Sequence, residues 1–356
     1  MSALELARPD LLALAGYSSA RMEASGGSIL LNANESPWPQ TGDAPLNRYP
    51  DPQPARLRSA LAALYGVDEA QLLIGRGSDE AIDLLVRAFC RAGRDAILIQ
   101  PPTFGMYAVC AAVQGAEVRT VPLSRETGFL PDFDAVLAAV DLSVKLVFVC
   151  APNNPTGDLA PRPAILALAD ALRGRALVVV DEAYIEFADA KSLAADVVAH
   201  ENLVVLRTLS KAHALAAARI GCLIAAPDII GLLRRIMPPY PVPTPCVEAA
   251  EDALSQVALY RTNARIALVR SEREHLRGLL NEIVDVREVL PSRANFLTVR
   301  FDDAGIRYAQ LIACGIVVRD VRRYPRLADA LRITVGSPDE NALLIVAIAQ
   351  SAEDAA

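Results

Sequence analysis

The chain has 356 residues, of which 53% are hydrophobic, and its formal net charge at pH 7 is −7. A chain of this length is longer than one hydrophobic core usually covers, so we expect one large and one smaller domain. The negative charge argues against nucleic acid or an anionic membrane as the main partner, and the longest apolar run near the end of the chain, 342–349, is too short to span a bilayer.

The start of the chain and its cysteines indicate the same cellular setting. Residues 1–16 contain Glu5 and Asp10 and have no basic segment, so we expect no signal peptide. The six cysteines are scattered and form no CxxC pair, so the sequence predicts neither a structural metal site nor a disulfide framework. We therefore expect a cytoplasmic protein without a bound metal ion.

In chain order, the first part is expected to be a helix and an arm at 1–27. A polar turn is expected at 31–37, followed by a proline-dense, extended stretch at 47–54. Short apolar strands come next, and they are expected at 72–74, 96–99, 118–121, 145–150, 176–180, 203–206 and 222–225. Such strands alternate with helical segments, for example 56–65 and 81–89, which is typical of a largely parallel sheet covered on both faces.

The last third of the chain has a different pattern. The proline-rich segment 238–245 is the clearest linker, and a long helical stretch follows it from about 247 to 280. A helix at 341–352 closes the chain. Between these two helices, strands are expected at 296–301, 316–319 and 330–336. This pattern predicts a smaller α+β domain.

We therefore predict an α/β fold in three parts. Residues 1–45 are expected to be an N-terminal arm that packs with the small domain. Residues 46–245 are expected to form the large domain, with a mostly parallel sheet of the seven-stranded type covered by helices. Residues 246–356 are expected to provide a long connecting helix and the small C-terminal domain.

Several side chains that can bind a ligand or take part in catalysis come at or just after the ends of the predicted strands. They are Phe104, Asn154, Asp181, Tyr184 and Lys211. In open α/β sheets, ligands bind outside the carboxyl ends of the strands. We therefore expect these side chains to converge on one site, and their convergence is a stronger signal than any one of them.

Lys211 stands among groups that bind anions. Thr208, Ser210 and Arg219 can each donate hydrogen bonds to an anionic oxygen. A lysine in this setting suggests an amine that forms a Schiff base with a phosphorylated aldehyde, because cationic neighbours favour its neutral, nucleophilic form. The alternative is a solvated lysine in a polar loop, and this stretch alone leaves both interpretations open.

Pyridoxal phosphate makes demands that this set of residues can meet. Lys211 can bind its aldehyde, Asp181 can keep its pyridine nitrogen protonated, and Tyr184 with Asn154 can hydrogen-bond its phenolate oxygen. Phe104 can stack on its ring. Its phosphate can be bound by a helix N-terminus and nearby donors, for which the candidates are Gly77, Ser78, Asp79, Thr208, Ser210 and Arg219.

Longer motifs extend almost from one end of the chain to the other. They are LNANES, NRYPDPQ, RGSDEAIDLLVRAFC, PPTFGMY, VFVCAPNNPTG, VVVDEAYIEF, VVLRTLSKAHALAAARIG, PYPVPTP and LRITVGS. With these motifs the chain resembles the pyridoxal enzymes of the aspartate-aminotransferase fold, and within them the histidinol-phosphate aminotransferase family. The segment 154–157 and the pair Ser210-Lys211 mark the superfamily, whereas 181–187 and 47–50 point to the narrower family.

The resemblance implies the cofactor roles given above and adds further ones. It implies a homodimer with shared active sites, in which Tyr49 reaches the cofactor phosphate of the other subunit. It also implies that Arg332 binds the anionic group of the substrate, that Arg319 and Tyr17 assist at the substrate phosphate, and that Asn34 contacts the substrate.

The chain departs from the family pattern near the lysine. The usual glycine before the arginine is replaced by Ala217, and His213 stands where the family has phenylalanine. We expect His213 to be structural. Phe104 replaces the usual tyrosine, which keeps the stacking surface and loses a hydroxyl. The loop 322–329 is another place where substrate contacts can differ.

The resemblance implies transamination between L-histidinol phosphate and 2-oxoglutarate, which gives imidazole acetol phosphate and L-glutamate. Lys211 would move the proton during this exchange. One rival is a threonine-phosphate decarboxylase of the same fold, and a nearer one is an aromatic amino acid aminotransferase. A third rival of another class is a module that binds a nucleotide without chemistry, and it predicts a colourless protein.

Overall fold

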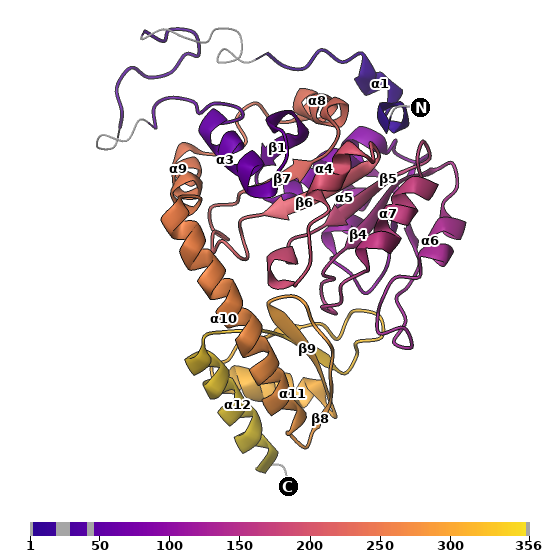
Figure 1. The fold of residues 1–356 in the computed structure, drawn as a ribbon, viewed down its shortest axis with the longest axis vertical. Helices are drawn as coiled ribbons and strands as arrows, with labels where there is room; N and C mark the ends of the chain where they lie inside the picture. The colour runs from indigo at the N-terminus through magenta and orange to yellow at the C-terminus, as the bar shows by residue number, and fades with distance from the viewer. Residues whose placement is uncertain (1–2, 19–28, 41–45, 354–356) are drawn as a thin grey trace.

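The structure, a computed structural model, describes residues 3–18, 29–40 and 46–353, with side chains up to residue 349. Figure 1 shows a large body of strands and helices and a smaller one below it. The long helix α10 (Gln256–Asn281) runs from one body to the other. This arrangement agrees with the expected large and small parts of the chain.

The large body is built on a seven-stranded sheet in the order β1-β7-β6-β5-β4-β2-β3. Its strands are β1 (Leu72–Gly75), β2 (Ala96–Ile99), β3 (Glu117–Thr120), β4 (Val144–Cys150), β5 (Leu177–Asp181), β6 (Leu203–Thr208) and β7 (Gly221–Ile224). All pairs from β3 through β6 are parallel, whereas β7 is antiparallel to both of its neighbours. The expected mostly parallel α/β sheet is confirmed.

Alternate residues of the central strands enter two separate hydrophobic clusters. Val178 and Val180 of β5 face one cluster, and Leu177 and Val179 face the other. Every residue of β5 is buried, because helices cover both faces. The first cluster contains residues of α3 (Ala55–Tyr65), α6 (Phe133–Ala139), α7 (Arg162–Ala171) and α9 (Thr244–Ala253); the second contains residues of α4 (Ser78–Phe89), α5 (Met106–Gln114) and α8 (Pro227–Ile236).

The small body has an antiparallel four-stranded sheet in the order β10-β11-β9-β8. Its elements are β8 (Val286–Val289), β9 (Phe296–Phe301), α11 (Ala304–Ala313), β10 (Arg319–Asp320), β11 (Ala330–Thr334) and α12 (Pro338–Glu353). Leu276 of α10, Leu297 of β9 and Leu331 of β11 belong to its core. Asp303 caps α11 by accepting hydrogen bonds from two backbone N–H groups of its first turn.

The start of the chain packs on the large body. Ala3 and Ala7 belong to the cluster that α4, α5 and α8 share, and Arg8 donates a hydrogen bond to the carbonyl of Arg87, 3.1 Å away. The helical segments here are a 3-10 turn, η1 (Ala3–Leu6), and α1 (Pro9–Leu12). These residues therefore contact the large body, and the expected packing of the arm on the small domain stays a prediction. Parts of the predicted arm, 19–28 and 41–45, lie outside the described residues, and the boundaries at 45 and 245 stay predictions.

Three further short helical turns complete the described chain: η2 (Glu69–Gln71), η3 (Ile185–Phe187) and η4 (Ala194–Val198). Within the described ranges, no helix is long and apolar enough to cross a membrane.

Candidate active site

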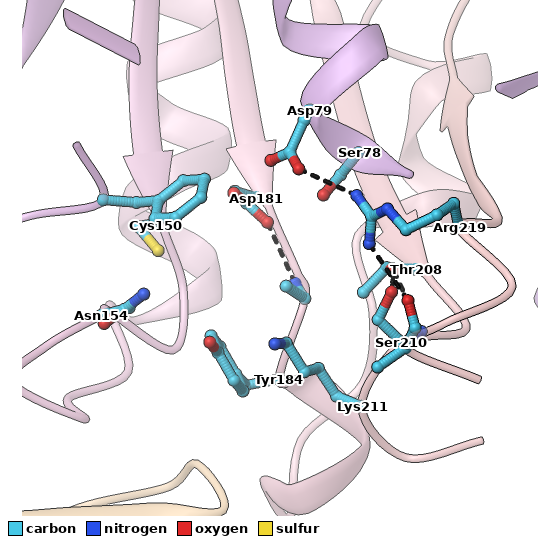
Figure 2. Close-up of a pocket in the computed structure, with 13 residues that line it drawn as sticks. Ser78, Asp79, Cys150, Asn154, Asp181, Tyr184, Thr208, Ser210, Lys211 and Arg219 are labelled. Carbon is cyan, nitrogen blue, oxygen red and sulfur yellow. Dashed lines mark hydrogen bonds and ion pairs between the residues drawn. The ribbon is translucent and has the colours of Figure 1, made fainter. Parts of the chain in front are cut away.

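A cavity of about 130 Å³ opens at the carboxyl ends of β4, β5 and β6 (Figure 2). The N-terminus of α4 and the loop after β6 complete its walls. Its lining residues are Ser78, Asp79, Phe104, Cys150, Asn154, Asp181, Ala183, Tyr184, Thr208, Ser210, Lys211, Ala216 and Arg219. The structure therefore brings together most of the residues predicted to bind the cofactor.

The N-terminus of α4 forms one wall, and it is held tightly against β7. Gly77 caps the helix with a φ of 80°, in the left-handed region that favours glycine. A Cβ atom on Gly221, the first residue of β7, would lie 2.5 Å from the backbone nitrogen of Ser78. The first N–H groups of a helix lack partners within the helix. This wall is therefore suited to bind a phosphate.

Arg219 lies against the same helix end. Its Nη2 donates to Oδ2 of Asp79 at 3.0 Å, and a Cβ atom on Gly77 would lie only 2.6 Å from Nη2. The Thr208 hydroxyl donates to the Ser210 hydroxyl oxygen at 3.0 Å. In Figure 2 these groups surround one end of the cavity. The arginine thus reaches the helix end although Ala217 replaces the usual glycine.

Asp181, the last residue of β5, is a buried carboxylate with 3% exposure. Its Oδ2 accepts a hydrogen bond from the hydroxyl of Tyr107 at 2.7 Å, and its Oδ1 accepts one from the N–H of Ala183 at 3.1 Å. Burial raises the pKa of Asp181, and the hydrogen bond from Tyr107 opposes that rise. A cationic partner in the cavity would stabilise the ionised form of this carboxylate.

The amine of Lys211 points toward the ring of Tyr184 (Figure 2), and Nζ of Lys211 lies 5.7 Å from the centre of that ring. Lys211 opens onto the cavity, yet partial burial lowers the pKa of its amine, as do the positive charges of Arg332 and Arg219. Burial also raises the pKa of the Tyr184 hydroxyl, which therefore stays protonated. The site thus holds an amine that loses its proton easily beside a hydroxyl donor.

The small body contributes Arg332, which lies on β11 opposite Arg319 of β10. Nη1 of Arg332 donates to the side-chain oxygen of Asn154. Within the described residues, its buried Nε has no hydrogen-bond partner. Arg332 thus reaches the edge of the cavity at Asn154, where its guanidinium can meet an anionic ligand. Arg319 is exposed.

The three remaining predicted residues lie apart from Lys211. Tyr17, Asn34 and Tyr49 line a separate hollow of about 590 Å³. The Tyr49 ring stacks on Tyr240 with 4.5 Å between ring centres, and the Tyr49 side chain is 53% exposed. Within one chain, therefore, the structure does not bring these residues into the Lys211 cavity.

Comparison with known proteins identifies the family. The family model for class I and II aminotransferases matches residues 31–348. The chain is 58% identical to the histidinol-phosphate aminotransferase of Stenotrophomonas maltophilia over 349 residues, which are 97% of this chain and 96% of the relative. It is 56% identical to that of Xanthomonas euvesicatoria, covering 99% and 98% of the two chains. The chain belongs to the class I and II aminotransferases, and within them to the histidinol-phosphate aminotransferase family.

A solved structure supports the same assignment. The histidinol-phosphate aminotransferase of Sinorhizobium meliloti, in complex with pyridoxal-5'-phosphate, is 27% identical, with a TM-score of 0.79. The alignment covers 88% of this chain and 85% of that one. The predicted family and the predicted aminotransferase class of enzyme are confirmed.

This aminotransferase uses pyridoxal phosphate, and its cavity fits that cofactor. The helix end with Arg219 can hold the phosphate, Asp181 can face the pyridine nitrogen, and Lys211 can reach the aldehyde. Phe104 offers an aromatic surface to the ring. Two observations favour the fit: the tight approach of Gly221 to the helix end, and a buried carboxylate, Asp181, that forms no ion pair with any of the described residues.

Sequence reasoning missed four residues around this cavity. Cys150, Ala183 and Ala216 line it, and Tyr107 lies behind Asp181. Tyr107 stands three residues after Phe104 in the motif PPTFGMY, and that proximity was the available signal. Its partner Asp181 comes 74 residues later in the chain, so the contact depends on the fold.

Proposed function

We propose that this aminotransferase transfers the amino group of L-histidinol phosphate to 2-oxoglutarate, giving imidazole acetol phosphate and L-glutamate in histidine biosynthesis. The names of its close relatives support this substrate. The observation that carries the proposal is the position of Arg332, whose guanidinium contacts Asn154 at the edge of the cavity. A guanidinium there can bind a phosphate or a carboxylate.

Bound pyridoxal phosphate supplies an aldehyde that takes up amines and a ring that accepts the electron pair of the substrate Cα–H bond. Lys211 removes the proton from Cα and returns one during the exchange, since its lowered pKa leaves the amine ready to accept a proton. With the cofactor bound, Asp181 would hold a proton at the ring nitrogen. Tyr184 and Asn154 would donate hydrogen bonds to the ring oxygen and so hold the ring beside the amine.

Two anionic groups must use the same part of the site in turn. Arg332, with Arg319 beside it on the neighbouring strand, binds the phosphate of histidinol phosphate in one half-reaction. The same pair binds a carboxylate of glutamate or 2-oxoglutarate in the other. Guanidinium groups suit both, because their parallel N–H donors match phosphate and carboxylate oxygens alike.

The proposal includes a cytoplasmic homodimer with shared sites. Tyr49, Tyr17 and Asn34 gather in a hollow away from Lys211 of their own chain. Glu35 accepts a hydrogen bond from the backbone N–H of Tyr49 at 2.7 Å, and the Tyr49 ring stacks on Tyr240, so both the backbone and the ring of Tyr49 are held in place. A half-exposed, fixed tyrosine suits a role in completing the site of a second subunit.

A substrate panel tests this function. Histidinol phosphate, phosphate-free histidinol, phenylalanine and threonine phosphate are each supplied with 2-oxoglutarate, and glutamate and carbon dioxide are measured. We expect the highest kcat/KM for glutamate formation with histidinol phosphate, and a large loss with histidinol. Faster turnover of phenylalanine would indicate an aromatic aminotransferase. Carbon dioxide from threonine phosphate, without glutamate, would indicate a decarboxylase.

A further inference from the structure

Tyr107 is a fully buried tyrosine whose orientation is fixed by aromatic neighbours. It lies on α5 with 0% exposure. Its ring stacks on Phe148 of β4, with 4.6 Å between ring centres and 13° between planes. The edge of Phe104, which lines the cavity, meets it at 5.6 Å and 82°. This packing leaves the hydroxyl one direction, toward Asp181.

The hydroxyl of Tyr107 donates to Oδ2 of Asp181 at 2.7 Å. The only other donor to this carboxylate that the described structure contains is the N–H of Ala183, 3.1 Å from Oδ1. Within the described ranges, no lysine or arginine forms an ion pair with Asp181. Cys150 lies nearby, but its thiol is directed to the carbonyl of Pro152 at 3.4 Å, and burial raises its pKa to about 12. Tyr107 is therefore the side chain that stabilises the ionised form of Asp181 by a direct hydrogen bond, and the charge of Lys211 acts in the same direction from farther away.

We propose that Tyr107 is a positioning residue of the transamination reaction, and that its hydrogen bond to Asp181 keeps the proton on the cofactor ring nitrogen instead of on the carboxylate. This inference rests on the proposed role of Asp181 as the partner of that nitrogen. The proton that the ring nitrogen and Asp181 share can reside on either of these two groups. A hydrogen bond that favours the carboxylate anion favours the protonated ring.

Because Asp181 is buried, its ionised form needs the hydrogen bond from Tyr107. A buried carboxylate tends to keep its own proton, because charge is poorly solvated in the interior. The Tyr107 hydroxyl is itself held in its protonated, donating form, since burial raises its pKa well above the usual value. A ring that lost its proton to Asp181 would be a weaker electron sink. The residue acts through Asp181, without touching substrate.

The test replaces the hydroxyl and leaves the ring. In Tyr107→Phe the stacking on Phe148 is retained. Two measurements follow: the affinity of the cofactor-free protein for pyridoxal phosphate, and the 15N NMR shift of the bound cofactor labelled at its ring nitrogen. We expect about tenfold to a hundredfold weaker binding, the usual range for a hydrogen bond to a charged group. We also expect a nitrogen shift displaced toward the unprotonated form. Unchanged affinity and shift would overturn the proposal.

A cofactor analogue with carbon in place of the ring nitrogen separates this role from a structural one. If Tyr107 acts through the ring nitrogen, Tyr107→Phe should weaken the analogue much less than pyridoxal phosphate. An equal loss for both would mean that the hydroxyl merely supports the fold and would overturn the proposal.

Two further variants serve as controls. Tyr65→Phe removes a buried hydroxyl that lies beside Arg207 and Cys222, so it should change neither the affinity nor the nitrogen shift. Asp181→Asn should displace the nitrogen shift toward the unprotonated form. If Asp181→Asn changed nothing, the role of Asp181 under the proposed function would fail. If only Tyr107→Phe changed nothing, the present inference alone would fail.

Discussion

The amine of Lys211 shares its cavity with positive charge from two arginines. Burial, Arg332 and Arg219 each favour the neutral amine, and the two arginines come from different parts of the chain. The sequence predicted the cationic neighbour Arg219, which follows in the same motif. The contribution of Arg332 could not be predicted from spacing, because it depends on β11 of the small body approaching Asn154.

Removing the charge of Arg332 should raise the pKa of Lys211. In Arg332→Gln the ammonium form loses a repelling neighbour, so the amine should become neutral only at higher pH than in the wild type. The measurement is the pH dependence of Lys211 labelling by an amine reagent in the cofactor-free protein. Arg319→Gln is the matched control, since Arg319 is exposed, and it should shift the profile less. A wild-type profile in Arg332→Gln would contradict this account.

Asp158 provides a second pH effect, behind the Asn154 loop. Burial raises its pKa to about 7 from the ordinary 3.8, while the Thr156 hydroxyl opposes the rise. Between these values the folded chain holds a proton that the unfolded chain releases. The contribution of Asp158 to the free energy of unfolding is therefore fully present below pH 3.8, and it falls as the pH rises to about 7.

Asp158→Asn should remove that dependence. Relative to the wild type, the variant should gain stability on going from pH 5 to pH 8, measured as the free energy of unfolding in urea. Asp134→Asn, at an exposed position of α6, is the control and should not show this gain. If the free energies of unfolding of Asp158→Asn and the wild type differed by the same amount at pH 5 and pH 8, Asp158 would not titrate with a raised pKa in the folded chain.

Among the elements, the contact between β7 and the N-terminus of α4 shapes the phosphate end of the cavity. The sequence predicted a glycine turn that leads into a helix, and the structure has it at Gly77. It did not predict the role of Gly221, because this residue meets the helix end only after β7 has paired antiparallel with β1. The small sheet was also harder to predict. The expected strand 316–319 is reduced to Arg319–Asp320, and the charged edge strand β8 carried no clear apolar alternation.

Gly221→Ala should weaken cofactor binding. Its Cβ would lie 2.5 Å from backbone atoms of Gly77 and Ser78, so the helix end must move. Overpacking of this kind typically costs about 1–3 kcal/mol, equivalent to roughly fivefold to a hundredfold in affinity for pyridoxal phosphate. The control is Gly231→Ala on α8, where, beyond its chain neighbours and the backbone of its own helix, no atom of the described residues lies within 4 Å of the added Cβ. The affinity for pyridoxal phosphate is measured by titration of the cofactor-free protein. Equal affinities in the two variants would show that the close approach of Gly221 to the N-terminus of α4 does not matter for cofactor binding.

In the molecule as a whole, the parallel order of β3 through β6 explains why side chains far apart in sequence converge on one edge. That convergence could be predicted from strand ends alone. The position of Tyr49 could not, because a single chain places it in another hollow, stacked on Tyr240. The packing of Ala3 and Ala7 on the large body was also missed, since short apolar segments carry no signal for which body they contact.

Mixed dimers should test the shared site. Lys211→Ala and Tyr49→Ala subunits are each expected to be nearly inactive alone. When they are mixed, a hybrid dimer has one site with both residues intact, so about a quarter of wild-type activity should return at equal mixing. Mixing each variant with itself is the control. Hybrids that form but show no recovery would indicate that Tyr49 does not complete the site of a second subunit.

The central claim, that Lys211 is the amine that holds the cofactor in this cavity, can be tested directly. The chain has three lysines, Lys145, Lys191 and Lys211. Borohydride reduction of the cofactor-loaded enzyme fixes the cofactor on the amine that carries it, and peptide mapping by mass spectrometry then locates it. The pyridoxyl group should be found on Lys211. Its presence on Lys145 or Lys191, with Lys211 unmodified, would contradict the account.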